Sequence, residues 1–275
     1  MNKPLTSSQW LFENLNHPDI IILDASQKSI TAKKVNPNEN LRIKGARYFD
    51  LKNNFSDNTA ALPNTFPNTA QFEAQFEAEC QKLGINDSSL IVVYDNLGIY
   101  SSPRVWWMLK IMGHKNVAVL NGGLPDWIKN KYPTENVKRQ QYELGNFKAK
   151  LQSNAVKNYN YIKANTKTNQ ALVLDARSEG RFNGTAAEPR EGLRSGSIPN
   201  SLNIPFGDVL ENGKFKPEEE LKAIFSKINP ENKELVYSCG SGLTACIVLL
   251  AGELILPNKT AIYDGSWTEW AQIKE

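Results

Sequence analysis

The chain has 275 residues, 40% hydrophobic and 22% charged, which is enough apolar sequence to build one large domain or two of average size. Its 32 basic residues nearly balance its 29 acidic ones and are scattered along the chain, which argues against nucleic acid as a partner. No apolar run approaches the ~18 residues of a membrane span, and the N-terminus lacks the apolar segment of a secretion signal. We therefore expect a cytoplasmic protein with no membrane partner.

The sequence contains an internal repeat. Residues 20–26 (IIILDAS) return as residues 172–178 (LVLDARS), and each is a short apolar run ending in Asp-Ala, as expected of a strand buried on both faces. The paired occurrence of Asp24 and Asp175 suggests that these carboxylates brace loops by hydrogen bonding. Two further matches follow in the same order: 90–95 with 234–239, and 117–127 with 260–270. A repeat of this length predicts duplicated domains.

Helical patterns separate the predicted strands. Residues 70–83 (AQFEAQFEAECQKL) and 218–228 (EEELKAIFSKI) carry apolar side chains near a spacing of three and four, which favours helices. Strands that alternate with helices predict an α/β layered domain, here repeated twice. The adjacent Trp106 and Trp107 are interpreted as packing residues, because no basic groove accompanies them.

The polar stretch 131–158 is rich in Lys, Asn and Gln and contains Pro133 and Gly145, a composition typical of a linker. We therefore place the first domain at 1–135, the linker at 136–157 and the second domain at 158–275.

Three cysteines are an odd number, so a disulfide framework is not expected. Cys80 and Cys246 are predicted to be buried core residues, which is the commonest fate of a lone cysteine. The two histidines, His17 and His114, stand apart and form no Cys/His cluster with zinc spacing. Neither a metal nor another cofactor is predicted.

Cys239 lies in a different context, because it opens the loop Cys239-Gly240-Ser241-Gly242-Leu243-Thr244 between a predicted strand, 235–238, and a predicted helix, 245–256. Backbone N–H groups in such a loop can converge on one point, and the helix N-terminus adds positive potential. Helix N-termini favour the thiolate form of cysteine, so Cys239 is the candidate nucleophile.

At this loop the sequence resembles the rhodanese superfamily, and within it the 3-mercaptopyruvate sulfurtransferases, whose loop is typically Cys-Gly-Ser-Gly-Val-Thr. The likeness extends to residues 100–109 (YSSPRVWWML), to the turn 121–124 with Trp127, and to residues 263–270 (YDGSWTEW). It implies two tandem rhodanese domains, each a parallel sheet flanked by helices. The first domain would be catalytically silent, since Asp95 stands where the second has Cys239.

The resemblance also implies a substrate site. Arg181 and Arg190 would bind the carboxylate and carbonyl of a 2-oxo acid thiol, together with the loop residues Gly240, Gly242, Leu243 and Thr244. Ser241 is a candidate for proton transfer. Some family members pair this serine with a first-domain histidine, but residues 50–63 contain none, and the family's usual His-Ile-Pro-Gly-Ala is Arg-Ile-Lys-Gly-Ala at 42–46. A complete serine triad is therefore not expected.

The implied reaction moves sulfur from 3-mercaptopyruvate onto Cys239 as a persulfide and then to a thiol, such as that of a thioredoxin-like protein, or to cyanide. The nearest alternative is thiosulfate sulfurtransferase, whose members typically have a Cys-Arg-Lys-Gly loop suited to a dianion. A cysteine phosphatase would need an arginine six residues after the nucleophile, and position 245 is alanine, so phosphatase activity is not expected. A non-catalytic binding module of the same fold is the alternative from another class.

Overall fold

The computed structural model describes residues 3–27, 38, 40–57, 62, 69–137, 140–228 and 233–273. The chain divides into two compact units. Unit 1 consists of Met1–Asn58, Phe66–Gln152 and Asn212–Lys214, and unit 2 of Thr59–Thr65, Ser153–Glu211 and Phe215–Glu275.

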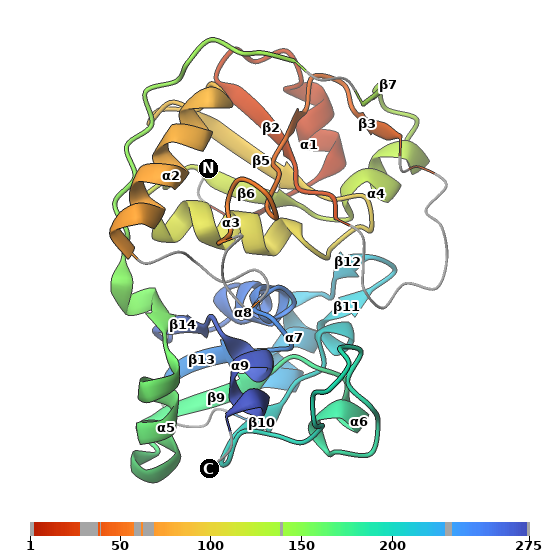
Figure 1. Cartoon of the computed structure of the whole chain (residues 1–275). Helices are drawn as coiled ribbons and strands as arrows, with labels where there is room; N and C mark the ends of the chain where they lie inside the picture. The colour runs from red at the N-terminus through yellow and green to blue at the C-terminus, as the bar shows by residue number, and fades with distance from the viewer. Residues whose placement is uncertain are drawn as a thin grey trace. The chain divides into compact units, whose positions relative to one another are not determined.

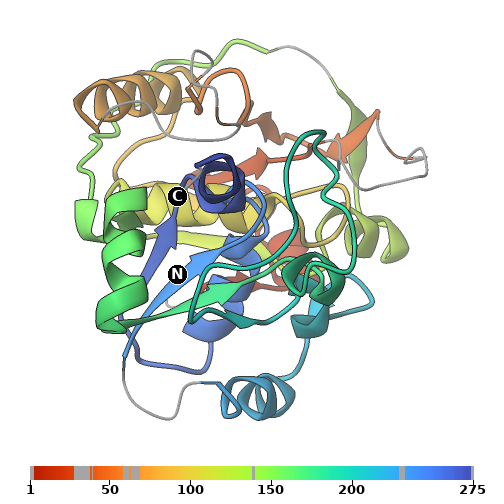
Figure 2. The same ribbon diagram turned by 60° about the horizontal axis from the view of Figure 1, so that its bottom comes forward.

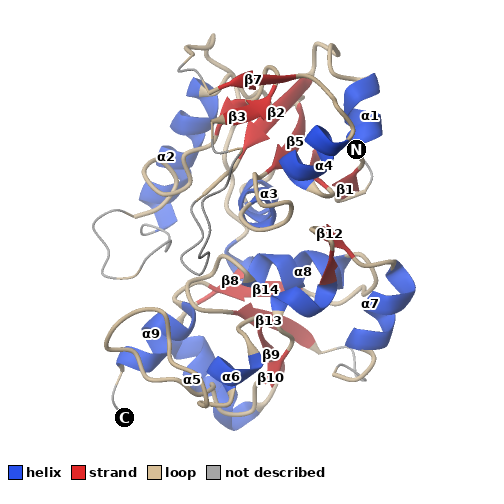
Figure 3. Cartoon of the chain, turned by 90° about the vertical axis from the view of Figure 1, so that its right-hand side faces the viewer, coloured by secondary structure: helices blue, strands red, loops and turns tan. Residues whose placement is uncertain are grey.

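The sheet of unit 1 has five strands in the order β1-β6-β5-β2-β4, and every neighbouring pair is parallel (Figure 1). Helices cover both faces, α1 and α4 on one and α2 and α3 on the other (Figure 3). A separate antiparallel pair joins β3 to β7. The bounds are β1 Leu5–Thr6, α1 Ser8–Glu13, β2 Ile20–Asp24, β3 Leu41–Ile43, β4 Arg47–Tyr48, α2 Thr69–Lys82, β5 Leu90–Tyr94, α3 Ser102–Ile111, β6 Val117–Leu120, α4 Gly123–Lys129 and β7 Thr134–Asn136.

The sheet of unit 2 has the order β10-β9-β13-β14-β8 and is also parallel throughout. Helices α5 and α9 cover one face, and α7 and α8 cover the other (Figures 2 and 3). The bounds are β8 Val156–Lys157, α5 Tyr159–Thr168, β9 Ala171–Asp175, α6 Glu179–Phe182, β10 Leu202–Asn203, β11 Leu210–Glu211, β12 Lys214–Phe215, α7 Glu218–Phe225, β13 Glu234–Ser238, α8 Ala245–Glu253, β14 Thr260–Tyr263 and α9 Ser266–Gln272, with 3-10 turns at Ser153–Ala155 and Phe206–Val209.

The two sheets share one topology. Strands β1, β6, β5, β2 and β4 of unit 1 correspond in position to β8, β14, β13, β9 and β10 of unit 2. Each strand pair that the repeat matched in sequence occupies the same place in its own sheet. The predicted duplication and the parallel α/β fold are therefore confirmed.

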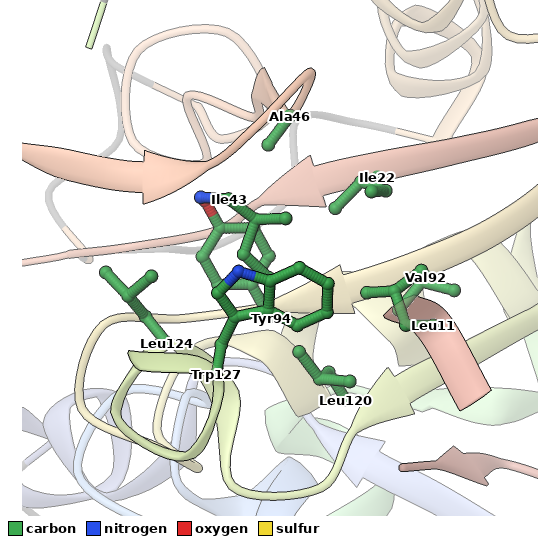
Figure 4. Packing of buried hydrophobic residues seen from close by; sticks show 9 residues of the cluster. All are labelled: Leu11, Ile22, Ile43, Ala46, Val92, Tyr94, Leu120, Leu124 and Trp127. Atoms are coloured by element: carbon green, nitrogen blue, oxygen red, sulfur yellow. The ribbon is translucent and has the colours of Figure 1, made fainter. Parts of the chain in front are cut away.

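The apolar side chains pack on the sheets as the repeat predicts. In unit 1, Leu11 of α1 and Trp127 of α4 pack with Ile22 and Val92 of the central strands (Figure 4). An equivalent cluster in unit 2 places Trp267 and Trp270 of α9 against β9, β13 and β14. Trp106 and Trp107 are buried, which confirms their predicted packing role.

The predicted linker runs along unit 1 for most of its length. The backbone N–H of Gly145 donates to the Gln81 carbonyl (2.8 Å), and that of Lys150 donates to the Met112 carbonyl (3.0 Å). Residues 140–152 thus belong to unit 1, where they are hydrogen-bonded to α2 and to the residue that follows α3. The domain boundaries at 135 and 158 stay predictions.

Candidate active site

Cys239 follows the last residue of β13, at the carboxyl edge of the sheet in unit 2. In the β13 register, Ser238 lies opposite Asp175 of β9, and Tyr237 lies opposite Ile262 of β14. The loops that leave three neighbouring parallel strands therefore begin side by side around Cys239. Ligands of open α/β sheets bind at this edge.

The start of α9 holds the backbone of Cys239 and Gly240 by four hydrogen bonds. Trp267 donates its N–H to the Cys239 carbonyl (2.9 Å). Thr268 donates both its N–H (3.0 Å) and its hydroxyl (2.5 Å) to the Gly240 carbonyl. The Cys239 N–H donates to the Ser266 hydroxyl (3.3 Å). The cysteine backbone is therefore fixed on the side that faces β14.

Both predicted arginines reach Gly240. A Cβ placed on Gly240 would lie 3.0 Å from Nη2 of Arg181 and 3.6 Å from Nη1 of Arg190. Nη1 of Arg190 also donates to the Thr268 hydroxyl (3.4 Å). Two guanidinium groups thus converge on the residue that follows Cys239. That they bind the substrate stays a prediction.

Arg181 is oriented by a buried ion network. Its Nη2 (2.6 Å) and Nε (3.1 Å) donate to Oε2 of Glu188, whose other oxygen accepts from Nη1 of Arg177 (2.7 Å). Arg177 in turn donates to both oxygens of Asp175 and lies with its guanidinium carbon 4.2 Å from the centre of the Trp267 ring. Asp175 and Asp24 also accept N–H groups of their own loops, so their predicted bracing role is confirmed.

Glu188, Arg177, Thr268 and Ser266 were not identified as site residues from the sequence. The signal for Glu188 was its place in Glu188-Pro189-Arg190, two residues before a predicted substrate arginine. Ser266 and Thr268 lie in the 263–270 segment, whose likeness to the family assigns a role to neither residue.

The remaining loop residues are close-packed. Cys239, Ser241 and Leu243 are buried, Gly242 has φ +76°, and Thr244 is the N-cap of α8. The positive φ of Gly242 is a conformation that favours glycine and turns the loop toward the helix. Burial raises the pKa of the Tyr263 hydroxyl well above its usual value, with Glu269 adding to the effect, so this neighbour of the loop stays protonated.

The corresponding loop of unit 1 shows what such a turn binds. Asp95 follows β5 as Cys239 follows β13. Its buried carboxylate accepts four backbone N–H groups at 2.8–3.0 Å, from Leu97, Tyr100 and Ser101 of the loop and from Ser102, the first residue of α3. The Ser102 hydroxyl also donates to it (2.6 Å). The loop is thus a cradle for an anion, and in unit 1 the chain supplies the anion itself.

Cys80 and Cys246 are both buried, which confirms their predicted core role; Cys80 lies on α2 of unit 1, and Cys246 lies in the first turn of α8, next to the loop. Burial raises the pKa of the Cys80 thiol well above its usual value. The Cys246 thiol donates to the Gly242 carbonyl at 3.5 Å. Within the described ranges, no group of three or more His, Cys, Asp or Glu side chains could hold a metal ion.

Comparison with known proteins gives the family. The rhodanese-like domain matches this chain twice, at residues 7–130 and 158–273. The chain belongs to the rhodanese family. Human 3-mercaptopyruvate sulfurtransferase is 37% identical over 278 residues, covering 98% of this chain and 92% of the human protein. Thiosulfate/3-mercaptopyruvate sulfurtransferase 1, mitochondrial, of Arabidopsis thaliana is also 37% identical, covering 98% and 76%.

Solved structures support the same family. The crystal structure of SseA from Escherichia coli, described as a 3-mercaptopyruvate sulfotransferase with the rhodanese fold, superposes with a TM-score of 0.83 at 33% identity and covers 97% of this chain and 99% of that one. Each rhodanese domain here has its own five-stranded sheet, and the cysteine loop occurs in the second. Among the described residues, no helix is both long and apolar enough to span a bilayer.

Proposed function

We propose that this protein is a 3-mercaptopyruvate sulfurtransferase in which Cys239 carries the sulfur as a persulfide. The observation that carries the proposal is the convergence of Arg181 and Arg190 on Gly240, the neighbour of the candidate nucleophile. Two guanidinium groups suit a donor that has both a carboxylate and an adjacent carbonyl. The relatives named above, similar over nearly the whole chain, support the same reaction.

The first half-reaction begins with attack of the Cys239 thiolate on the sulfur of 3-mercaptopyruvate. A sulfur–sulfur bond forms as the carbon–sulfur bond breaks, and the electron pair of that bond leaves with pyruvate as its enolate, which then takes up a proton. Negative charge therefore moves from sulfur to the enolate oxygen, where Arg181 and Arg190 would stabilise it as it develops.

The second half-reaction returns the cysteine. A thiolate or cyanide attacks the outer sulfur, and the sulfur–sulfur bond breaks to give an acceptor persulfide or thiocyanate together with the Cys239 thiolate. The N–H groups of the loop, including Gly240, Gly242, Leu243 and Thr244, would hold the anionic persulfide, as the matching loop of unit 1 holds the Asp95 carboxylate. Proton transfer by Ser241 stays a prediction.

Mass spectrometry after exposure to 3-mercaptopyruvate tests the nucleophile. We expect one adduct of ~32 Da on the wild-type protein, located at Cys239, because nucleophilic catalysis requires this intermediate. Cys239→Ser should lose the adduct and pyruvate release. Cys80→Ala is the matched control and should retain both, because Cys80 is buried in α2 of the other unit. A wild-type protein without an adduct would instead indicate a non-catalytic binding module.

Thiosulfate is the alternative donor, favoured by its place in the name of the Arabidopsis thaliana relative described above. Gly240 and Ser241 are uncharged, whereas a dianion favours added cations at these positions. We therefore expect a higher kcat/KM with 3-mercaptopyruvate than with thiosulfate, and the reverse order would overturn the donor assignment. The acceptor, a thioredoxin-like thiol or cyanide, and a cytoplasmic location remain part of the proposal.

A further inference from the structure

Ser266 has a backbone conformation that is rare for its residue type. Its φ is +51°, in the left-handed region where an L side chain is strained, and the residue is fully buried. Strain of this kind persists only where the surrounding structure fixes it, and it concentrates at functional sites.

The repeat shows that this strain is specific to unit 2. Within the matched segments 117–127 and 260–270, the residue at the position of Ser266 is Gly123, whose φ is also +51°. A Cβ on Gly123 would collide with the carbonyl oxygens of Asp95 and Gly98. The same positive φ is therefore adopted by a glycine beside Asp95 and by a strained serine beside Cys239.

The Ser266 hydroxyl forms two hydrogen bonds that glycine cannot form. It accepts the N–H of Cys239 (3.3 Å) and donates to the carbonyl of Tyr263 (2.9 Å). These bonds connect the end of β13 to the end of β14, directly at the candidate nucleophile. They satisfy a buried N–H and fix the orientation of the peptide that carries the cysteine.

We propose that Ser266 is a positioning residue for Cys239, holding its backbone so that the thiolate can attack in line and the persulfide stays in the loop cradle. The inference deepens the proposed function and rests on it. It also explains why a strained serine occupies a position where glycine would relieve the strain. Of the two, only serine supplies the hydroxyl that fixes the Cys239 backbone.

The test compares Ser266→Gly with Ser266→Ala. Both variants lack the hydroxyl, but only glycine relieves the left-handed strain, so Ser266→Gly should unfold at a higher urea concentration than Ser266→Ala. Both should nevertheless lose about tenfold or more in kcat with 3-mercaptopyruvate, because small misplacement of a reacting group is costly. KM should change less than twofold, since the Ser266 hydroxyl bonds to the backbone of Cys239 and Tyr263 rather than to either arginine.

Persulfide lifetime provides a readout that a merely structural role would not change. After removal of the donor, we expect the ~32 Da adduct to decay faster in Ser266→Gly than in the wild-type protein, although the variant is well folded. If Ser266→Gly has the kcat and the adduct lifetime of the wild-type protein while Cys239→Ser is inactive, the positioning role of Ser266 is wrong and the proposed function stands. An active Cys239→Ser would instead overturn the proposed function itself.

Discussion

Glu188 is the residue on which the orientation of Arg181 depends. Its side chain is 2% exposed and links Arg181 to the buried Arg177. Glu188→Gln keeps an acceptor but removes the charge, so one of these charge-assisted hydrogen bonds must weaken or break. We expect KM for 3-mercaptopyruvate to rise about tenfold and the free energy of unfolding to fall by about 1–3 kcal/mol, measured by steady-state kinetics and urea denaturation.

Glu191→Gln is the matched control, because Glu191 lies three residues further along the same segment and is exposed. It should leave both quantities unchanged. A Glu188→Gln variant with wild-type KM would show that Arg181 does not depend on this carboxylate for its position.

Gly240 provides a second, purely steric test of the arginine site. A Cβ there would lie 3.0 Å from Nη2 of Arg181, closer than most real contacts, so Gly240→Ala must displace that guanidinium. We expect KM for 3-mercaptopyruvate to rise severalfold, by an effect comparable to losing one hydrogen bond. Gly207→Ala is the control, since its Cβ would meet no atom within 4 Å. Equal KM values in the two variants would contradict the assignment of Arg181 to the substrate site.

Sequence reasoning located residues with a strong local pattern or a family motif and missed those that act through tertiary contacts. Cys239 stands at a strand–loop–helix junction that can be read from neighbouring residues alone. Ser266 is 27 positions further on, and its hydrogen bond to Cys239 exists only because β13 and β14 are adjacent parallel strands. Glu188 likewise has its role because it pairs with Arg177 and Arg181, and no periodic pattern in the sequence indicates these ion pairs.

At the scale of elements, the loop after β5 is a complete anion cradle held together by its own carboxylate. Asp95 is fully buried, and Asp95→Ala would leave four backbone N–H groups without their acceptor. We expect a loss of about 3 kcal/mol or more in the free energy of unfolding, measured by denaturant titration. Asp95→Asn retains one oxygen and should lose less; an equal or larger loss would contradict the role of the acceptor oxygens.

The helices were predicted more accurately at their starts than at their ends. The pattern at 70–83 became α2 (Thr69–Lys82), whereas 218–228 and 245–256 ended earlier, as α7 (Glu218–Phe225) and α8 (Ala245–Glu253). After both shortened helices, the chain continues in tighter turns, in which Ile228 donates to Phe225 and Ile255 to Gly252. Apolar residues in such a final turn keep helical spacing although the regular helix has ended, so the pattern overestimates the length.

At the scale of the whole molecule, duplication explains both the fold and its asymmetry. Two sheets of identical strand order present the same loop at the same edge, and one residue at the strand end decides whether that loop binds its own carboxylate or offers a thiol. The repeat could be predicted because buried strands constrain sequence strongly. The packing of residues 140–152 within unit 1 could not be predicted, because a polar segment without helix or strand carries no periodic signal.

The stability of the molecule should fall in mild acid through His114. Burial lowers the pKa of this imidazole below its usual 6.5, outweighing the hydrogen bond between Nε2 and the Ser89 carbonyl (2.9 Å) and the charge of Asp87, which act in the opposite direction. The unfolded chain therefore binds a proton before the folded one does. The contribution of neutral His114 to the free energy of unfolding should be fully present above pH ~6.5. It should fall as the pH decreases through and below that value, by at most about 1.4 kcal/mol per pH unit for one group.

His114→Gln keeps an N–H that can donate to Ser89 but cannot titrate, so the free energy of unfolding should change less between pH 7.5 and pH 5.5 in this variant than in the wild-type protein. His17→Gln is the control, because His17 is exposed, and it should retain the wild-type slope. Parallel curves for wild type and His114→Gln would mean that other groups dominate acid unfolding. A smaller slope would identify one buried histidine of unit 1 as a determinant of the acid stability of the chain.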